Sequence, residues 1–81
     1  MQAQDIRRGV LDTLRGIAPE VAVETLDDRH ALRDQVDLDS MDWLNVLLGL
    51  HSRFGVDIPE ADYARLTTIE QIVGYIAARL R

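Results

Sequence analysis

Apolar residues recur at helical spacing in the first part of the chain, from about Gln4 to Ile17. The stripe consists of Ile6, Val10, Leu14 and Ile17, at steps of four, four and three residues. This is the spacing of one face of an α-helix. Pro19 follows soon afterwards and ends the pattern, since proline removes a backbone donor. The pattern predicts a first amphipathic helix.

A second helix is predicted to begin at Asp39 or Ser40 and to end near Phe54. Either residue can cap it, Asp42 suits its first turn, and Gly55 suits its C-terminal end. The apolar arc contains Trp43, Leu44, Val46, Leu47, Leu50 and Phe54, and the opposite face contains Asp42, Asn45, Gly49, Ser52 and Arg53, with Met41 and Leu48 between the two faces. The arc is wider than one core contact needs, so we expect part of it to face a partner.

The C-terminal part of the chain predicts one short helix and one long helix. Pro59 is a good first position for a short helix over Glu60–Arg65. Thr67 and Glu70 match a capping box, which marks the start of the last helix. The apolar stripe of that helix consists of Ile69, Ile72, Val73, Ile76 and Leu80.

Between the first two long helices, residues Glu20–Asp39 show no sustained periodicity. We expect a long loop there, with room for a turn of helix around Thr25–His30, and loops of this length are often functional. Its anchors in the core are predicted to be Leu26, Leu32, Val36 and Leu38. The predicted fold is all-α: one domain over residues 1–81, a small four-helix bundle with three principal helices, one short helix and this loop.

Length and charge exclude several classes of function. The chain has 81 residues, no cysteine and a formal net charge of −5. Residues 20–62 hold eleven acidic and three basic residues, and the remainder holds three acidic and six basic residues, giving −8 and +3. This acidity argues against nucleic acid or an anionic membrane as the main partner. With no signal-peptide pattern and no apolar run of membrane-spanning length, we expect a cytoplasmic protein.

The residues that could perform chemistry are few. His30 and His51 are 21 positions apart, and the acids do not follow a calcium-loop pattern, so no metal site is predicted. Ser40 and His51 lie eleven positions apart on one predicted helix, which separates them by about 16 Å. They cannot form a nucleophile–base pair, so we expect no enzymatic activity.

Ser40 stands where a serine can carry a phosphate ester. It opens a helix after an acidic loop, and an anion there would lie at the positive end of the helix dipole. The alternative is that Ser40 is an ordinary helix cap.

The segment Leu32–Asp42, with Asp39-Ser40-Met41 at its end, resembles the acyl carrier protein family, whose signature is Asp-Ser-Leu at the start of the second helix. Phe54–Pro59 is similar to the family's aromatic residue, short loop and Ile-Pro step. Leu66–Ile69 is similar to its entry into the last helix, and Tyr75-Ile76 fits that helix. The resemblance covers about Ala31 to Leu80, while the first helix agrees in pattern.

The resemblance implies that Ser40 receives 4′-phosphopantetheine from coenzyme A, transferred by a separate Mg-dependent phosphopantetheinyl transferase. The thiol of that arm holds an acyl group as a thioester and presents it to loading and transferring enzymes of fatty-acid, lipid or polyketide-type synthesis. Asp39 then caps the helix and helps to dock the transferase. The carrier itself is expected to work as a monomer.

This chain departs from the family along the second helix. Fatty-acid-synthesis carriers have acidic residues there, whereas this chain has Asn45, His51, Ser52 and Arg53, and only Asp42 keeps its charge. The resemblance therefore implies a specialised carrier with dedicated partners. The predicted partner-binding residues are Met41, Asp42, Leu44, Asn45, Leu48 and Ser52, so the contact is more apolar than in the family.

Trp43 is a second departure, because the family has a smaller residue near the space that shelters the acyl chain. One hypothesis is that Trp43 restricts this space to short or unusual acyl groups, and the other is that it completes the core or packs under the loop. Two further functions remain as alternatives. One is a non-covalent helical adaptor that kept the carrier fold, and the other is an aminoacyl or D-alanyl carrier.

Overall fold

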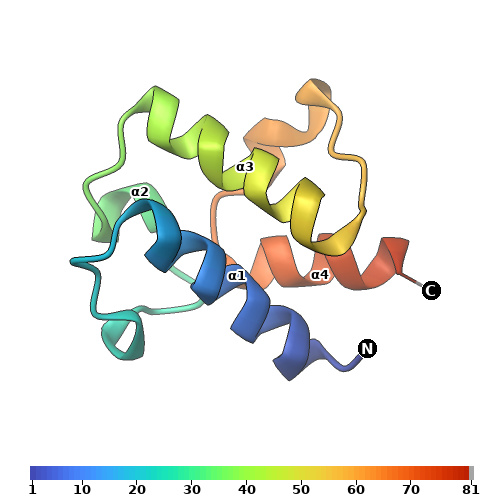
Figure 1. Ribbon diagram of the computed structural model, residues 1–81, viewed down its shortest axis with the longest axis horizontal. Coiled ribbons are helices and arrows are strands. Elements are labelled where there is room, and N and C mark those ends of the chain that lie inside the picture. The colour runs from blue at the N-terminus through green and yellow to red at the C-terminus, as the bar shows by residue number, and fades with distance from the viewer. Residues whose placement is uncertain (81) are drawn as a thin grey trace.

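The computed structural model describes residues 1–80, and all regular elements among them are helices (Figure 1). The long helices are α1 (Ala3–Ile17), α3 (Ser40–Phe54) and α4 (Ile69–Arg79), and the short ones are α2 (Leu32–Gln35) and two 3₁₀ helices, η1 (Val23–Thr25) and η2 (Glu60–Arg65). α1 packs against both α3 and α4. The predicted all-α bundle with three principal helices is confirmed.

The core draws side chains from the three long helices, from the loop before α3 and from the segment between α3 and α4. The buried apolar residues are Ile6, Val10, Leu14, Ala18, Leu32, Val36, Leu38, Val46, Leu47, Leu50, Val56, Leu66, Ile69, Ile72 and Ile76. Of the four predicted loop anchors, Leu32, Val36 and Leu38 are buried and Leu26 is half-buried. The loop therefore contributes to the same core that holds the helices together.

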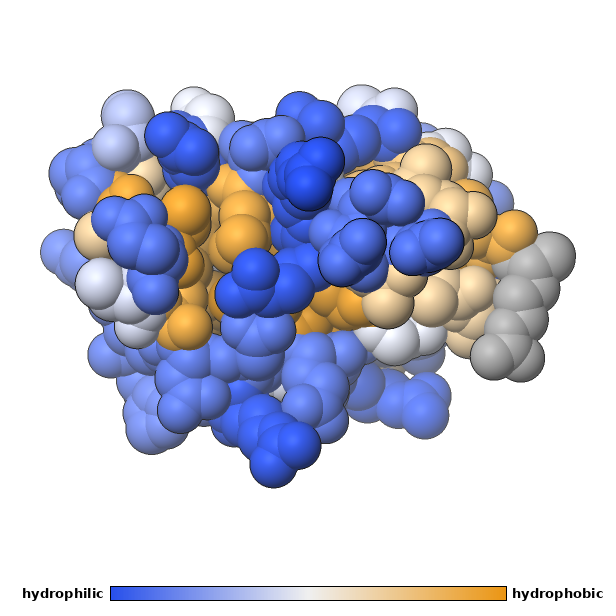
Figure 2. Space-filling view, turned by 90° about the horizontal axis from the view of Figure 1, so that it is seen from below, coloured by the Kyte–Doolittle hydropathy of each residue, from blue (hydrophilic) through white to orange (hydrophobic). Residues whose placement is uncertain are grey.

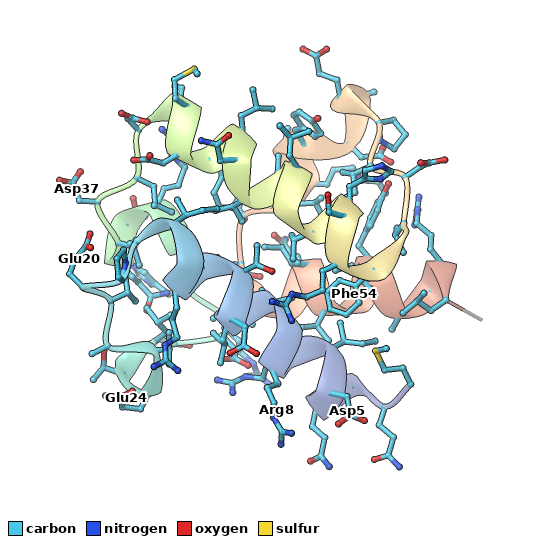
Figure 3. The ribbon with its side chains drawn as sticks, in the orientation of Figure 1. Asp5, Arg8, Glu20, Glu24, Asp37 and Phe54 are labelled. Atoms are coloured by element: carbon cyan, nitrogen blue, oxygen red, sulfur yellow. The ribbon has the colours of Figure 1, made fainter. Side chains whose placement is uncertain are left out.

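Helix α1 approaches α3 closely at two glycines. A Cβ added at Gly9 would lie 2.5 Å from Cζ of Phe54, and one added at Gly49 would lie 2.7 Å from Cγ2 of Thr13. Figure 3 shows Phe54 inside the bundle while Asp5, Arg8 and the labelled acids of the loop point outward. Gly49 was predicted on the polar face of the second helix, and the structure corrects this: the missing side chain lets α1 pack there.

The loop Glu20–Asp39 holds more helix than the sequence indicates. The turn predicted around Thr25–His30 is displaced, because the 3₁₀ turn covers Val23–Thr25. The short helix α2 was not predicted. One turn buries only Leu32, which is too little for a periodic pattern.

Two details of the C-terminal helix also differ from the prediction. Thr68, not Thr67, is its N-cap, and its hydroxyl accepts from the N–H of Gln71 at 3.1 Å. The capping partner is thus Gln71 instead of Glu70, one position later than the sequence pattern predicted. Leu80, predicted on the apolar stripe, is 38% exposed because it follows the last helical residue.

An ion pair fastens the long loop to α1. The guanidinium of Arg7 donates from Nε to Oδ2 of Asp28 at 2.7 Å and from Nη2 to Oδ1 at 2.9 Å. The carbonyl of Asp28 also accepts from the N–H of Glu70, and the N–H of Leu32 donates to the carbonyl of Thr67 at 2.8 Å. The loop is therefore tied to α1 on one side and to the start of α4 on the other.

The underside of the bundle is mostly hydrophilic (Figure 2). Apolar residues show there in two areas, one beside the chain termini and one at the opposite end. The exposed apolar residues at the termini are Met1 and Leu80.

The Arg7–Asp28 pair makes a testable prediction about acid stability. The Arg7 hydrogen bonds lower the pKa of Asp28 below its usual 3.8. Both side chains are over a third exposed, so after solvent screening we expect Arg7→Gln to lower the free energy of unfolding by about 0.5–1 kcal/mol at neutral pH. Because the pKa of Asp28 is lower in the folded protein, its carboxylate stabilises the fold at pH values above 3.8. The difference in unfolding free energy between the natural chain and Arg7→Gln should therefore disappear as the pH falls below 3.8 and Asp28 becomes protonated.

Urea unfolding of both proteins at several pH values measures this difference. Arg8→Gln is the matched control, because Arg8 is exposed on the same helix. A loss that is unchanged at low pH, or one equal to that of the control, would contradict the prediction.

Candidate functional site

Ser40 is the first residue of α3, and Asp39 immediately before it is the N-cap. Oδ1 of Asp39 accepts from the N–H of Asp42 at 2.8 Å, and Oδ2 of Asp42 accepts from the N–H of Asp39 at 3.3 Å. The sequence allowed either Asp39 or Ser40 as the cap, and the structure assigns the cap to Asp39. The exposed Ser40 is therefore not needed to cap the helix.

A cation binds the backbone two residues before Ser40 although the surrounding loop is acidic. The guanidinium of Arg33, on α2, donates to the carbonyl of Leu38 from Nη2 at 3.3 Å and from Nε at 3.4 Å. The charge of Arg33 and the positive end of the α3 dipole both oppose the negative charge of Asp39 and Asp42. Sequence reasoning missed Arg33 because its place depends on α2, which had no periodic signal.

The outer face of α3 is apolar and exposed. Met41 is 67% exposed, Leu48 is 51% exposed and Leu44 is 38% exposed. The inner side of the helix buries Val46, Leu47 and Leu50. The expectation that part of the apolar arc faces outward holds for Leu44. We call Met41, Leu44 and Leu48 the outer apolar stripe.

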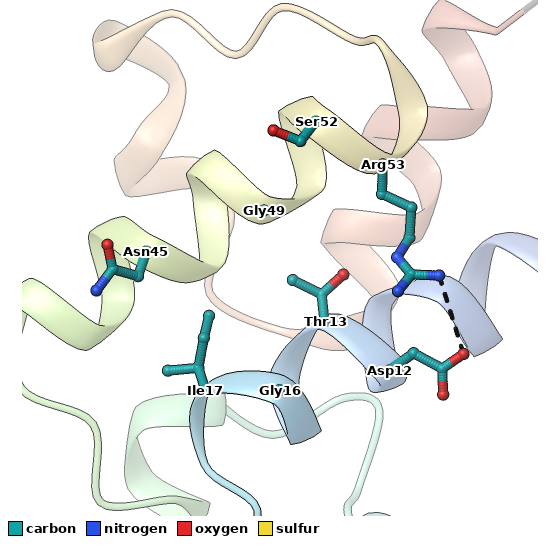
Figure 4. A pocket seen from close by; sticks show the side chains of 8 residues that line it. All are labelled: Asp12, Thr13, Gly16, Ile17, Asn45, Gly49, Ser52 and Arg53. Atoms are coloured by element: carbon teal, nitrogen blue, oxygen red, sulfur yellow. Dashed lines mark ion pairs between the residues drawn. The ribbon is translucent and has the colours of Figure 1, made fainter.

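A shallow groove of about 570 Å³ runs between α1 and α3 (Figure 4). It is lined by Asp12, Thr13, Gly16, Ile17, Asn45, Gly49, Ser52 and Arg53. Arg53 reaches across to Asp12, with 4.0 Å between Nη1 and Oδ2. The structure therefore divides the predicted partner-binding set, since Asn45 and Ser52 lie on the wall of this groove.

A second groove, of about 290 Å³, lies on the η2 side of α3. It is lined by Leu47, Leu48, His51, Asp57, Ile58, Pro59 and Tyr63. Nδ1 of His51 lies 3.0 Å from the carbonyl oxygen of Val56 and 3.6 Å from Oδ1 of Asp57. We call this the His51 groove.

Trp43 is half-buried and packs against the core between α3 and η2. It lines a small cavity of about 220 Å³ together with Ala31, Arg33, Tyr63, Ala64, Leu66 and Thr67. Trp43 therefore packs against the core, as one of the two hypotheses from the sequence expects. It also lines a cavity one turn beyond Ser40, and its effect on acyl groups stays a prediction.

A polar cluster holds η2 against α4. The hydroxyl of Tyr75 donates to Oδ2 of Asp62 at 2.7 Å, and Arg79 lies 3.6 Å from the same carboxylate. The Arg79 guanidinium also stacks 3.5 Å from the centre of the Tyr75 ring. Burial, together with the bond to Asp62, raises the pKa of Tyr75. Tyr63, on η2, lines both the His51 groove and the Trp43 cavity. The polar cluster therefore holds in place the helix that carries this shared wall.

Residues 1–80 contain no group of three or more His, Asp or Glu side chains arranged to hold a metal ion. Within the same residues, no helix has the length and apolarity needed to cross a membrane.

Comparisons with known proteins agree with this arrangement. The family described as phosphopantetheine attachment site matches residues 8–76. The chain belongs to the acyl carrier protein family. An acyl carrier protein of Renibacterium salmoninarum is 38% identical over 63 residues, covering 78% of this chain and 73% of its own. Acyl carrier protein 3 of Ralstonia nicotianae is 31% identical over 74 residues, covering 88% and 85%.

The fold of this carrier is also similar to a solution structure from Anaplasma phagocytophilum, solved as a candidate acyl carrier protein. The TM-score is 0.88 at 25% identity, and the match covers 100% of this chain and 94% of the other. The carrier's prosthetic group is accordingly a covalently attached 4′-phosphopantetheine. The exposed Ser40 hydroxyl at the positive end of α3 suits the phosphodiester of that group.

Proposed function

We propose that this carrier bears its phosphopantetheine on Ser40 and presents acyl groups to enzymes of fatty-acid, lipid or polyketide-type synthesis. When bound, the group supplies a flexible arm and a thiol that holds the acyl group as a thioester. The chain's own residues position that arm and offer a surface that partner enzymes recognise. The tether raises the effective concentration of the acyl group at a docked enzyme.

The capping box of α3 is the observation that supports Ser40 most strongly. Because Asp39 and Asp42 satisfy the cap, modification of the Ser40 oxygen breaks no hydrogen bond that the helix start needs. The positive end of the α3 dipole offsets part of the new negative charge. Asp39 is exposed beside Ser40 and is therefore also available to a docking transferase.

The outer apolar stripe is the proposed docking surface for partner enzymes. Met41, Leu44 and Leu48 are exposed on α3 downstream of Ser40, and Asn45 and Ser52 border them on the side of α1. Asp42 is the one acidic residue of α3, so this face offers little charge to a partner. We infer that dedicated partners bind it mainly through apolar contact.

Attachment at Ser40 is tested by intact mass. The purified chain is incubated with coenzyme A, Mg²⁺ and a broad-specificity phosphopantetheinyl transferase. We expect the mass of one phosphopantetheine to be added to the natural chain and none to Ser40→Ala. Ser52→Ala is the matched control, because Ser52 is the other serine of the chain, and it should still be modified.

A non-covalent adaptor is the second candidate, and the exposed outer apolar stripe favours it. The same mass measurement separates the two functions. An unmodified natural chain, alongside a control carrier that the transferase does modify, would favour the adaptor. A partner that binds Ser40→Ala as tightly as the natural chain would favour it as well.

The docking surface is tested with the transferase itself. We expect Leu48→Ser to raise its KM for the carrier by about three- to tenfold with little change in kcat, because loss of an interface side chain weakens binding. Leu80→Ser is the matched control, since Leu80 is exposed at the far end of α4. Equal KM values for the two variants would remove Leu48 from the proposed surface.

Trp43 is proposed to limit the length of acyl chain that the bundle can shelter. The indole occupies a wall of the 220 Å³ cavity, and Trp43→Ala would enlarge that cavity. We expect the variant to protect long acyl thioesters from hydrolysis at least several-fold better than the natural chain, while its free energy of unfolding falls by about 3 kcal/mol. Unchanged thioester half-lives in a folded variant would leave Trp43 with a packing role alone.

A further inference from the structure

The side of α3 that carries Ser40 leads to the His51 groove. At about 100° per residue, Leu44, Leu47 and His51 lie within about 40° of the direction of Ser40. The residues of the groove toward α1, such as Asn45 and Gly49, lie more than about 130° away. Of the two grooves that flank α3, a chain attached to Ser40 that follows the helix therefore approaches the His51 groove and not the groove beside α1.

The spacing between Ser40 and His51 matches the reach of the arm. Eleven residues at about 1.5 Å each place His51 about 16 Å along the helix axis from Ser40. A phosphopantetheine chain has about fourteen bonds from the serine oxygen to its sulfur, and about 1.2 Å of extension per bond gives about 17 Å. The Trp43 cavity begins about 4.5 Å along the axis, so a bent arm delivers an acyl chain to that cavity and an extended arm delivers it to the His51 groove.

The His51 groove is small and has a polar end. Its volume of about 290 Å³ corresponds to about ten groups of the size of a water molecule, which admits a short acyl group. The polar groups of the groove come from His51 and Asp57. Its apolar walls are formed by Leu47, Leu48, Ile58, Pro59 and Tyr63. A short chain with a polar substituent suits this combination.

The contacts of the His51 ring decide which of its nitrogens is free to bind a polar substituent of the acyl group. The carbonyl of Val56, 3.0 Å from Nδ1, can only accept, so Nδ1 carries the hydrogen. Asp57, 3.6 Å from the same nitrogen, favours the same tautomer. In the neutral imidazole, Nε2 then offers a lone pair, which attracts a donor. The titratable groups that face His51 in the groove are Asp57 and Tyr63.

We propose that His51 selects short hydroxyacyl groups, whose hydroxyl donates a hydrogen bond to Nε2. This rests on the proposed attachment at Ser40. An unsubstituted acyl group leaves Nε2 without this partner. An acyl group with a carboxylate is disfavoured, because its negative charge would lie near Asp57 and face the lone pair of Nε2. His51 is a specificity residue here and takes no part in bond making.

The experiment compares three cargoes of equal length: butanoyl, 3-hydroxybutanoyl and succinyl. Each is loaded onto the full chain from the corresponding acyl-coenzyme A with the transferase, and intact mass verifies loading at Ser40. Nitrogen-15 chemical shifts of the His51 ring and the hydrolysis half-life of each thioester are then measured at neutral pH. We expect the Nε2 shift to respond to 3-hydroxybutanoyl alone, with a half-life about three- to tenfold longer than for butanoyl.

Variants separate hydrogen bonding from packing. His51→Phe should abolish the difference between 3-hydroxybutanoyl and butanoyl, and His51→Gln, whose amide oxygen can accept, should restore part of it. His30→Phe is the matched control, because His30 is exposed in the long loop and should keep the full difference.

Three results would overturn the inference. One is an equal His51 response to butanoyl and 3-hydroxybutanoyl, another is a half-life that is longest for succinyl, and the third is a difference that survives in His51→Phe. Failure to load any cargo would instead refute attachment at Ser40, so the two proposals fail in distinguishable ways.

Discussion

The hydrogen bonds between Asp39 and Asp42 fix the residue at which α3 begins, and the exposure of the Ser40 oxygen depends on that start. If Ser40 were the cap, the helix would begin one residue later and the serine hydroxyl would be bonded to the backbone. With Asp39 as the cap, Ser40 is the first helical residue and its oxygen is exposed. Burial of Val46, Leu47 and Leu50 then sets which sides of α3 face outward.

The contacts behind α3 keep that surface in place. Gly9 and Gly49 let α1 lie close enough to hold one side of the helix. On the other side, contacts of Asp62 with Tyr75 and Arg79 hold η2 against α4. The η2 wall of the His51 groove is therefore held in place by α4. The grooves on the two flanks are thus bounded by packed elements, and the outer face between them is left free for a partner.

The sequence predicted the long helices well because each has a sustained apolar stripe and a recognisable end. Gly55, with a φ of 66°, ends α3 as expected. The long loop could not be predicted, because its order comes from single distant contacts such as Arg7 with Asp28, which leave no periodic pattern. Ser40 was predicted as the attachment site from local sequence, whereas the grooves and the place of Arg33 depend on how separate elements pack.

The distribution of charge and apolar surface suits a protein that must bind several enzymes and leave each of them. Residues 20–62 carry a net charge of −8, most of it outside the outer face of α3, so charge can speed the encounter with a basic partner. The exposed large apolar side chains of α3 are Met41, Leu44 and Leu48. An interface between the carrier and an enzyme that is centred on these three side chains would be small. We expect such a complex to dissociate quickly, because it buries little apolar area. Such docking would not distinguish one cargo from another, so the proposed selection among cargoes is assigned to the grooves beside α3.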